Sequence, residues 1–257
     1  MTSATGTAHR YFVWLYAQNV LRLRYRGAWL GAAWSILQPA LYLVLMAFVF
    51  AVVNRASLRD YVVYLFAGLI PWRFLEQAAL GMMESVPAHG MYTRKVRVPL
   101  FYFPAVQFLV ALVDFFVAFG ILVAVLAWQQ PWALPVIVLP AAVLVWAGIA
   151  AGLGLLLSVL FVFFRDIRPL VQMGLMFLLF TSTIYFKPET IAADATRLRL
   201  LAWDPVCYWA ALFQKPIYAG TWPLAADWTV SAASAAVLLA AGALSYRAAH
   251  NRMHYYL

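Results

Sequence analysis

Apolar residues form six long segments in this chain of 257 residues, and the charged residues lie almost entirely between them. The clearest segment runs from Trp34 to Val53 without a charged side chain. A helix of this length covers the roughly 30 Å hydrocarbon core of a bilayer, and lipid leaves a helix as the expected spanning form. The pattern predicts an all-α integral membrane protein with six transmembrane helices, at about 34–53, 61–83, 101–127, 133–163, 169–186 and 228–246.

Two further segments do not fit a membrane span. Residues 8–26 mix apolar side chains with four arginines, which suits an amphipathic helix lying in the membrane interface. A solvated basic tail is the alternative for this segment. Residues 187–227 contain too many charges to span, yet they are too rich in tryptophan, tyrosine and proline for a plain soluble loop.

Composition narrows the class of protein further. Hydrophobic residues make up 66% of the chain and charged residues 11%, whereas soluble domains carry about 25% charged residues. The formal net charge of +9 comes from short basic clusters at the ends of apolar segments. Such clusters indicate membrane topology and lipid headgroup contact and argue against nucleic-acid binding. The single Cys207 excludes an internal disulfide, and His250 and His254 lack a third metal ligand nearby.

The distribution of lysine and arginine predicts the orientation of the chain. Eleven of these residues lie in the two terminal segments and in the loops after the second and fourth expected spans, against six on the other side. The positive-inside rule therefore predicts that both termini are cytoplasmic and that residues 187–227 face outward.

Charged residues inside the spans are few. Arg73 and Glu76 share a helix face, and Asp114 lies at a similar depth in the next span. A charge at the bilayer centre costs at least about 2.5–3.5 kcal/mol, so we expect an intramembrane ion pair of Arg73 with Glu76 or Asp114. It would either join the two spans or line a polar path. Gly148 and Gly152 form a G-x-x-x-G motif, which predicts close helix packing.

Several sequence motifs then share one order along the chain: Arg22-Leu-Arg-Tyr-Arg-Gly-Ala-Trp-Leu-Gly-Ala-Ala-Trp-Ser-Ile-Leu-Gln-Pro39, Gly68-Leu-Ile-Pro-Trp-Arg-Phe74, Arg97-Val-Pro-Leu100, Val162-Phe-Phe-Arg-Asp-Ile-Arg168 and Asp204-Pro205. Together they resemble the membrane subunits of bacterial polysaccharide-export ABC transporters, which export O-antigen, capsule or teichoic acid. The resemblance covers essentially the whole chain. It departs at Thr183, where the family often has proline, and at Asp204, where it usually has asparagine.

The resemblance implies a homodimeric, non-enzymatic permease in the bacterial inner membrane. It implies that two separate ATPase subunits bind ATP and Mg, with no cofactor in this chain, and the absence of a G-x-x-x-x-G-K-[ST] motif agrees. The substrate would be a polysaccharide on an undecaprenyl-type lipid, moved from cytoplasm to periplasm. The resemblance also implies a coupling helix in the loop after the second span and re-entrant gate helices within 187–227.

Four groups of candidate residues follow from the resemblance and from side-chain chemistry. The arginine forks of the first basic cluster suit a lipid diphosphate, although topology alone also explains them: Arg22, Arg24, Tyr25 and Arg26. The segment Pro87–Arg97 suits contact with the ATPase subunit, or a headgroup-binding loop, through His89, Met91, Tyr92, Arg94 and Lys95. Aromatic rings that pack on the C–H faces of sugars are expected along the channel: Tyr42, Phe177, Phe180 and Tyr185. The periplasmic gate is expected at Trp203, Tyr208, Trp209 and Phe213.

Three other functions stay open on the sequence. An ABC permease for a drug or a lipid would share most of these features. A membrane-embedded enzyme of envelope synthesis would need converging catalytic groups, and the sequence has no G-x-S-x-G motif. An ion-coupled secondary transporter should show an internal repeat and more intramembrane carboxylates.

Overall fold

The computed structural model describes residues 16, 18, 34–53, 58–88, 99–129, 133–187, 201 and 203–256. All regular structure in these ranges is helical, which confirms the all-α prediction. The elements are α2 (Trp34–Val53), α3 (Leu58–Ala88), α5 (Tyr102–Gln129), the 3₁₀-helix η2 (Leu134–Val138), α6 (Leu139–Phe163), α7 (Ile167–Thr181), α10 (Pro205–Gln214), the π-helix η3 (Lys215–Ala219) and α11 (Ala225–Tyr256).

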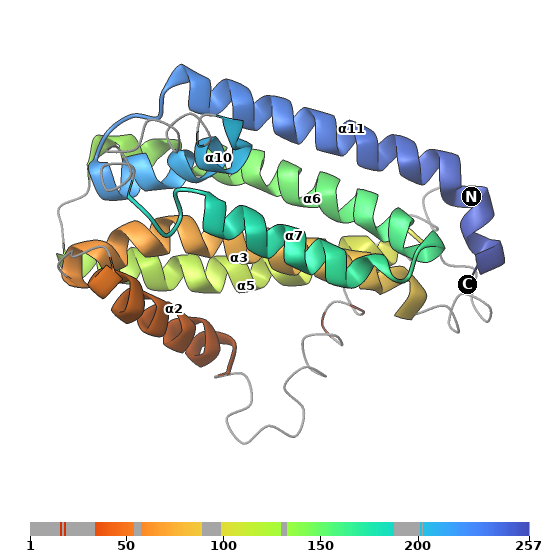
Figure 1. Ribbon diagram of the computed structural model, residues 1–257, viewed down its shortest axis with the longest axis horizontal. Helices are drawn as coiled ribbons and strands as arrows, with labels where there is room; N and C mark the ends of the chain where they lie inside the picture. Colours follow the sequence, from red (N-terminus) through yellow and green to blue (C-terminus); the bar gives the residue numbers. More distant parts are fainter. Residues whose placement is uncertain are drawn as a thin grey trace, which may run out of the picture.

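Helix α3 is the centre of the bundle. It packs against α5 and α6, and α6 in turn packs along α11. Most side chains of α3 between Tyr61 and Val86 are buried. Helix α2 touches α3 and then diverges from the bundle, while α10 lies at the end where α7 finishes and α11 begins (Figure 1).

Three helical segments of the described residues are long and apolar enough to cross a membrane: Tyr102–Ala124, Leu134–Phe163 and Ala225–Ala249. Helix α7 is apolar but has only 15 residues. Helix α2 has the bounds of the first expected span, Trp34–Val53. The full set of six spans stays a prediction.

Helices α6 and α11 approach each other closely, which confirms the packing role predicted for the glycines of α6. A Cβ atom at Gly152 would lie 2.4 Å from the backbone nitrogen of Leu239. A Cβ atom at Gly242 would lie 2.7 Å from the carbonyl oxygen of Gly152. These helices therefore meet backbone to backbone, and a larger residue at either position has no space.

Two helix ends differ from the expected ranges. Helix α3 continues to Ala88, so Pro87 lies inside it and does not begin the loop. Helix α7 ends at Thr181, five residues before the end of the fifth expected span, because Ser182 adopts an extended conformation. Residues 182–187, called the strap below, continue from α7 without helical structure.

Candidate functional site

Tyrosine hydroxyls of α3 hold the strap through its backbone. Tyr61 donates to the carbonyl of Tyr185 at 2.5 Å. The single O–H of Tyr64 is shared between the carbonyls of Thr183 and Phe186, the latter at 2.9 Å. Non-helical backbone in an apolar surrounding needs such partners, because an unpaired buried carbonyl costs free energy. The two tyrosines therefore explain how the chain can leave the helix while its backbone carbonyls are buried.

Gln214, at the end of α10, holds the strap from the other side. Its Nε2 donates to the carbonyl of Thr183 at 3.3 Å, and the side chain is buried. A Cβ atom at Gly68 of α3 would lie only 2.7 Å from the same Nε2. Glycine at this position thus leaves the space in which α3, the strap and α10 meet.

A contiguous row of five side chains runs along α2, α3 and the end of α7. The guanidinium of Arg73 lies over the ring of Tyr42, 4.7 Å from its centroid. The hydroxyls of Tyr42 and Tyr185 are 3.4 Å apart. Tyr185 stacks on Phe180 with 5.2 Å between ring centroids. At the other end, Arg73 Nη1 lies 3.4 Å from Glu76 Oε2.

We call these residues, Glu76, Arg73, Tyr42, Tyr185 and Phe180, the polar–aromatic row. The structure brings together two sets of residues that the sequence suggested separately, the channel aromatics and the ion pair. Phe177, one turn earlier on α7, is exposed, and none of these contacts includes it. The row therefore joins three of the four predicted channel aromatics to the charged residues of α3.

Asp114 precedes a residue of α5 that packs beside Arg73 on α3. The next residue, Phe115, packs on Phe74 with 5.2 Å between ring centroids, and Phe74 follows Arg73 in α3. Arg73 contacts Glu76, one of the two partners considered for it. A pair between Arg73 and Asp114 stays a prediction.

The four expected gate residues divide into two groups. Trp209 and Phe213 are buried in α10 and meet the ring of Trp146 edge-on, at 6.1 and 5.6 Å between centroids. Trp146 also donates to the carbonyl of Pro71 at 2.8 Å. In contrast, Trp203 is 87% exposed and Tyr208 is partly exposed. Only the first group lies inside the bundle.

Asp204 fixes the start of α10 as a helix cap. Its Oδ1 accepts from the backbone N–H of Val206 at 2.9 Å, and Thr181 Oγ1 lies 3.5 Å from its Oδ2. Burial raises the pKa of this carboxyl, while these hydrogen bonds act in the opposite direction. Burial likewise raises the pKa of the nearby Cys207 thiol to about 11, so this cysteine is a poor nucleophile at neutral pH.

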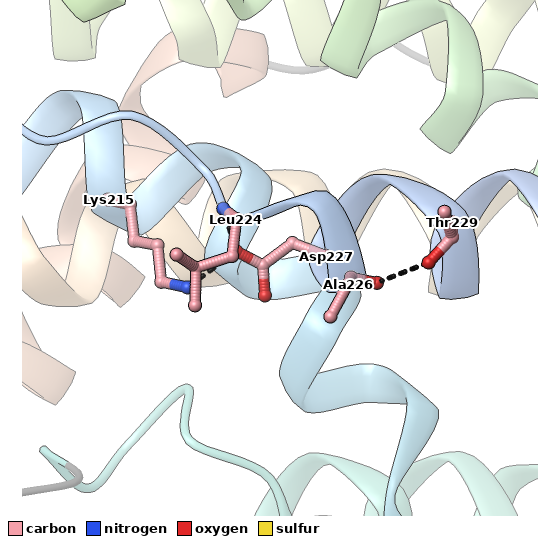
Figure 2. Close-up of polar contacts among 5 residues, drawn as sticks. All are labelled: Lys215, Leu224, Ala226, Asp227 and Thr229. Carbon is pink, nitrogen blue, oxygen red and sulfur yellow. Dashed lines mark hydrogen bonds and ion pairs between the residues drawn. The ribbon is translucent and has the colours of Figure 1, made fainter.

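An ion pair closes the turn between η3 and α11. Lys215 Nζ lies 2.5 Å from Asp227 Oδ2, which also accepts from the backbone N–H of Leu224 at 2.7 Å (Figure 2). The intervening turn requires a positive φ of 63° at Gly220, a conformation that favours glycine. Asp227 is buried, so this pair ties the start of η3 to the first turn of α11.

The last residue of the strap, Lys187, contacts two tyrosines. Lys187 Nζ donates to the hydroxyl of Tyr218 at 2.5 Å and lies 4.5 and 5.7 Å from the ring centroids of Tyr218 and Tyr64. Sequence reasoning missed these residues together with Tyr61, Lys215 and Asp227. The acidic residue three positions into a helix start was a usable signal for Asp227. Nothing in the sequence placed Tyr61 and Tyr64 against the strap.

The remaining predicted site residues lie outside the described residues, so their roles stay predictions: Arg22, Arg24, Tyr25, Arg26, His89, Met91, Tyr92, Arg94 and Lys95. Within the described residues, Arg168 Nε pairs with Glu84 Oε1 at 2.8 Å and joins the start of α7 to the last turns of α3. In the part of the chain that the structure describes, no three His, Cys, Asp or Glu residues gather as a metal site would require.

Residues 11–218 match the ABC-2 type transporter family. The chain belongs to this family. Among its relatives, the O-antigen export system permease protein RfbA of Myxococcus xanthus is 26% identical over 223 residues, which cover 86% of each chain. Two proteins of the same name from Klebsiella pneumoniae are 25% and 24% identical over 178 and 180 residues, 66% of this chain and 67% of theirs.

These matches confirm the resemblance to polysaccharide-export permeases that the sequence motifs suggested. The range matched to the ABC-2 type transporter family contains α2 to α10 and the whole polar–aromatic row. The whole of α11 lies beyond the matched range. In this ABC-2 type transporter the row and the strap therefore belong to the part shared with the family.

Proposed function

We propose that this chain is the membrane-spanning subunit of an ABC exporter that moves a lipid-linked polysaccharide from the cytoplasm to the periplasm. Three relatives named as O-antigen export permeases support the substrate class. A separate ATPase subunit supplies the energy, because ATP-driven transport needs a nucleotide-binding motif that this sequence lacks. Two copies of this chain pair with two copies of the ATPase.

The polar–aromatic row is the observation that carries this proposal. It combines ring faces with a guanidinium, a carboxylate and phenolic hydroxyls along one side of α2, α3 and α7. Sugar rings have apolar C–H faces that pack on aromatic rings and hydroxyls that bond to polar groups. A sliding polymer is served better by several weak contacts of this kind than by one tight site.

The position of the α10–η3 segment supports the proposed periplasmic gate. Trp146, which α10 contacts, lies about 20 Å along the η2–α6 helix from Leu134, at roughly 2.0 Å per residue in η2 and 1.5 Å in α6. The hydrocarbon core is about 30 Å thick, so α10 reaches well into it from the outer side. Such a depth is what a re-entrant gate helix requires.

The remaining parts of the proposal concern topology and the cytoplasmic side. We assign six spans in the inner membrane with both termini in the cytoplasm, α7 and the strap together forming the fifth. Helix α7 alone rises only about 22 Å, which agrees with its continuation into the strap. The arginines at 22–26 would meet the lipid diphosphate, and the loop after α3 would dock on the ATPase.

A deletion in the source bacterium tests the proposed function. Without this chain, the lipid-linked polymer should accumulate in the cytoplasm and disappear from the cell surface, and the wild-type chain should restore it. A complement with an ATPase subunit that binds but does not hydrolyse ATP should fail to restore surface polymer. Unchanged surface polymer after deletion, together with altered sensitivity to a drug, would favour the drug-permease alternative.

A further inference from the structure

The exposed side of α3 is polar, which is unusual for a helix at membrane depth. Arg73 and Glu76 have side chains that are 36% and 33% exposed, and Gln77 beside them is also exposed. These three positions share one face of the helix. Around them α3 is covered by apolar side chains of other helices, as at Trp72, Phe74 and Leu75.

Lipid cannot be the surrounding of this polar face. Arg73 lies near the middle of α3, and a charged side chain facing lipid at that depth costs at least about 2.5–3.5 kcal/mol. The exposed residues of α2 and α11 include large apolar side chains, as at Phe48 of α2 and Val237 of α11. The face of Arg73, Glu76 and Gln77 must therefore meet water or a polar partner.

The polar groups of this face have bonding capacity left. A guanidinium has five N–H donors, and its strongest bonds are bidentate. Within the described residues Glu76 is the one acceptor of Arg73, in a single contact of 3.4 Å. The ring of Tyr42 lies against the face of the guanidinium, 4.7 Å from the ring centroid, so it takes none of the in-plane N–H donors. Glu76 in turn has acceptor positions beyond this one contact.

We propose that Arg73, Glu76 and Gln77, with the ring of Tyr42, form a binding site for the hydroxyl groups of a neutral sugar in the translocation path. The sugar hydroxyls would accept from the guanidinium edge and donate to the carboxylate, and a C–H face would meet an aromatic ring of the row. Because Arg73 and Glu76 have opposite charges, the site has no net charge and favours uncharged sugars over a polyanion such as a poly(alditol phosphate). This inference rests on the proposed function and specifies its substrate class.

The first test asks what the polar face meets. Cys207→Ser removes the only cysteine, and Gln77→Cys or Val237→Cys then places one thiol on the polar face or on the apolar face of α11. Membrane fragments that contain the transporter and its ATPase subunit, and that are accessible from both sides, are then treated with a charged methanethiosulfonate. Labelling should be faster at position 77 than at position 237. At position 77, labelling should also be slower in membranes from cells that make the lipid-linked polymer than in membranes from cells whose polymer synthesis is blocked.

Two results of this experiment would overturn the inference. Labelling at position 77 that is no faster than at 237, or that is indifferent to the polymer, would show that the face does not line the path. Complete oxidative cross-linking of two copies through position 77, with or without polymer, would make the face an interface between subunits.

The second test concerns binding chemistry. Arg73→Lys keeps the charge and loses the planar fork, and Glu76→Gln removes the carboxylate charge. Each should lower export about tenfold at equal membrane levels, since each weakens charge-assisted hydrogen bonds. Arg247→Lys, an exposed residue of α11, is the matched control and should export at the wild-type rate.

The outcomes separate this inference from the proposed function. If deletion of the chain abolishes surface polymer while both variants export normally, the sugar site is wrong and the exporter assignment stands. If Glu76→Gln raises export, the substrate is anionic and the neutral-sugar assignment fails. If the charge variants do not reach the membrane, the polymer dependence of labelling at position 77 decides.

Discussion

The two sides of the bundle are built from opposite kinds of contact. Between α6 and α11, Gly152 and Gly242 bring two backbones together with no side chain between them. Between α2, α3 and the strap, the contacts are made by tyrosine hydroxyls, stacked rings and a guanidinium. The first interface depends on the absence of side chains and the second on side chains with both apolar and polar parts.

This difference indicates that the two sides of the bundle have different roles. In lipid, close packing of small residues is a main source of helix association, so the α6–α11 interface suits a fixed scaffold. Aromatic and hydrogen-bonding side chains can exchange partners with a passing ligand, so the α2–α3–strap side suits the wall of a path. The predictions below test this division, beginning with the substitution expected to have the largest effect.

Gly152→Ala should break the scaffold. Its Cβ would lie 2.4 Å from the nitrogen of Leu239 and 2.5 Å from the carbonyl carbon of Leu238, and these backbone atoms cannot move cheaply. We expect a loss of about 3 kcal/mol of stability or more, seen as a lower Tm and less monodisperse protein in detergent. Gly174→Ala, where no atom lies within 4 Å of the new Cβ, is the control and should be neutral or stabilising. Equal Tm values for the two variants would contradict the close approach of α6 and α11.

Asp227→Asn should loosen the junction of η3 and α11. It removes the charge that Lys215 meets at 2.5 Å and weakens the acceptor of the Leu224 N–H. Loss of about 1–3 kcal/mol is expected for a buried charge-assisted contact, with faster hydrogen exchange between residues 215 and 227. Thr229→Ala removes an exposed hydrogen bond to Ala226 in the same turn and should change exchange little. The same exchange in both variants would show that the ion pair does not hold the junction.

Tyr64→Phe should distinguish the structural contacts of the strap from the contacts of the polar–aromatic row. The hydroxyl of Tyr64 bonds to two strap carbonyls, so its loss should cost about 1–2 kcal/mol of stability. Tyr42→Phe loses only a contact of 3.4 Å with Tyr185, and its Tm should stay close to that of the wild type. If Tyr42→Phe lowers Tm as much as Tyr64→Phe does, the row is a structural cluster and not the adaptable wall of a path.

Asp204→Asn should have the smallest effect and a distinct dependence on pH. Because burial raises the pKa of Asp204 in the folded state, its contribution to stability is fully present below the ordinary value of 3.8 and declines as pH rises through the folded pKa. An asparagine oxygen can still cap Val206 without a charge. The variant should match the wild type in acid and equal or exceed it at neutral pH. A lower Tm than wild type at neutral pH would contradict this.

Much of the fold could be predicted because the thickness of the bilayer sets the length that an apolar helix needs to cross it. The bounds of α2 and the close packing at Gly152 follow from hydropathy and helix geometry. The early end of α7 could not be predicted in this way, since Phe180 to Tyr185 is apolar enough to continue the helix. It ends where hydroxyls from residues more than 100 positions away bind the carbonyls of the strap that follows it.

The same reasoning explains which site residues were missed. Tyr42, Phe180 and Tyr185 stood out because aromatic rings suit sugars, but their link to Arg73 depends on how α2 leans on α3. Lys215 and Asp227 are 12 residues apart and meet only because the chain reverses at Gly220. Contacts of this kind depend on tertiary structure, which no local pattern encodes.

Photo-cross-linking to the polymer tests the central claim most directly. A photoreactive phenylalanine analogue placed at Tyr42 lies in the row, and one placed at Val237 lies on the exposed apolar face of α11. In cells that make the lipid-linked polysaccharide, with an ATPase subunit that cannot hydrolyse ATP, illumination should attach polymer to the chain at position 42 and not at 237. Polymer attached equally at both positions, or at neither, would contradict a polysaccharide path along α2, α3 and the strap.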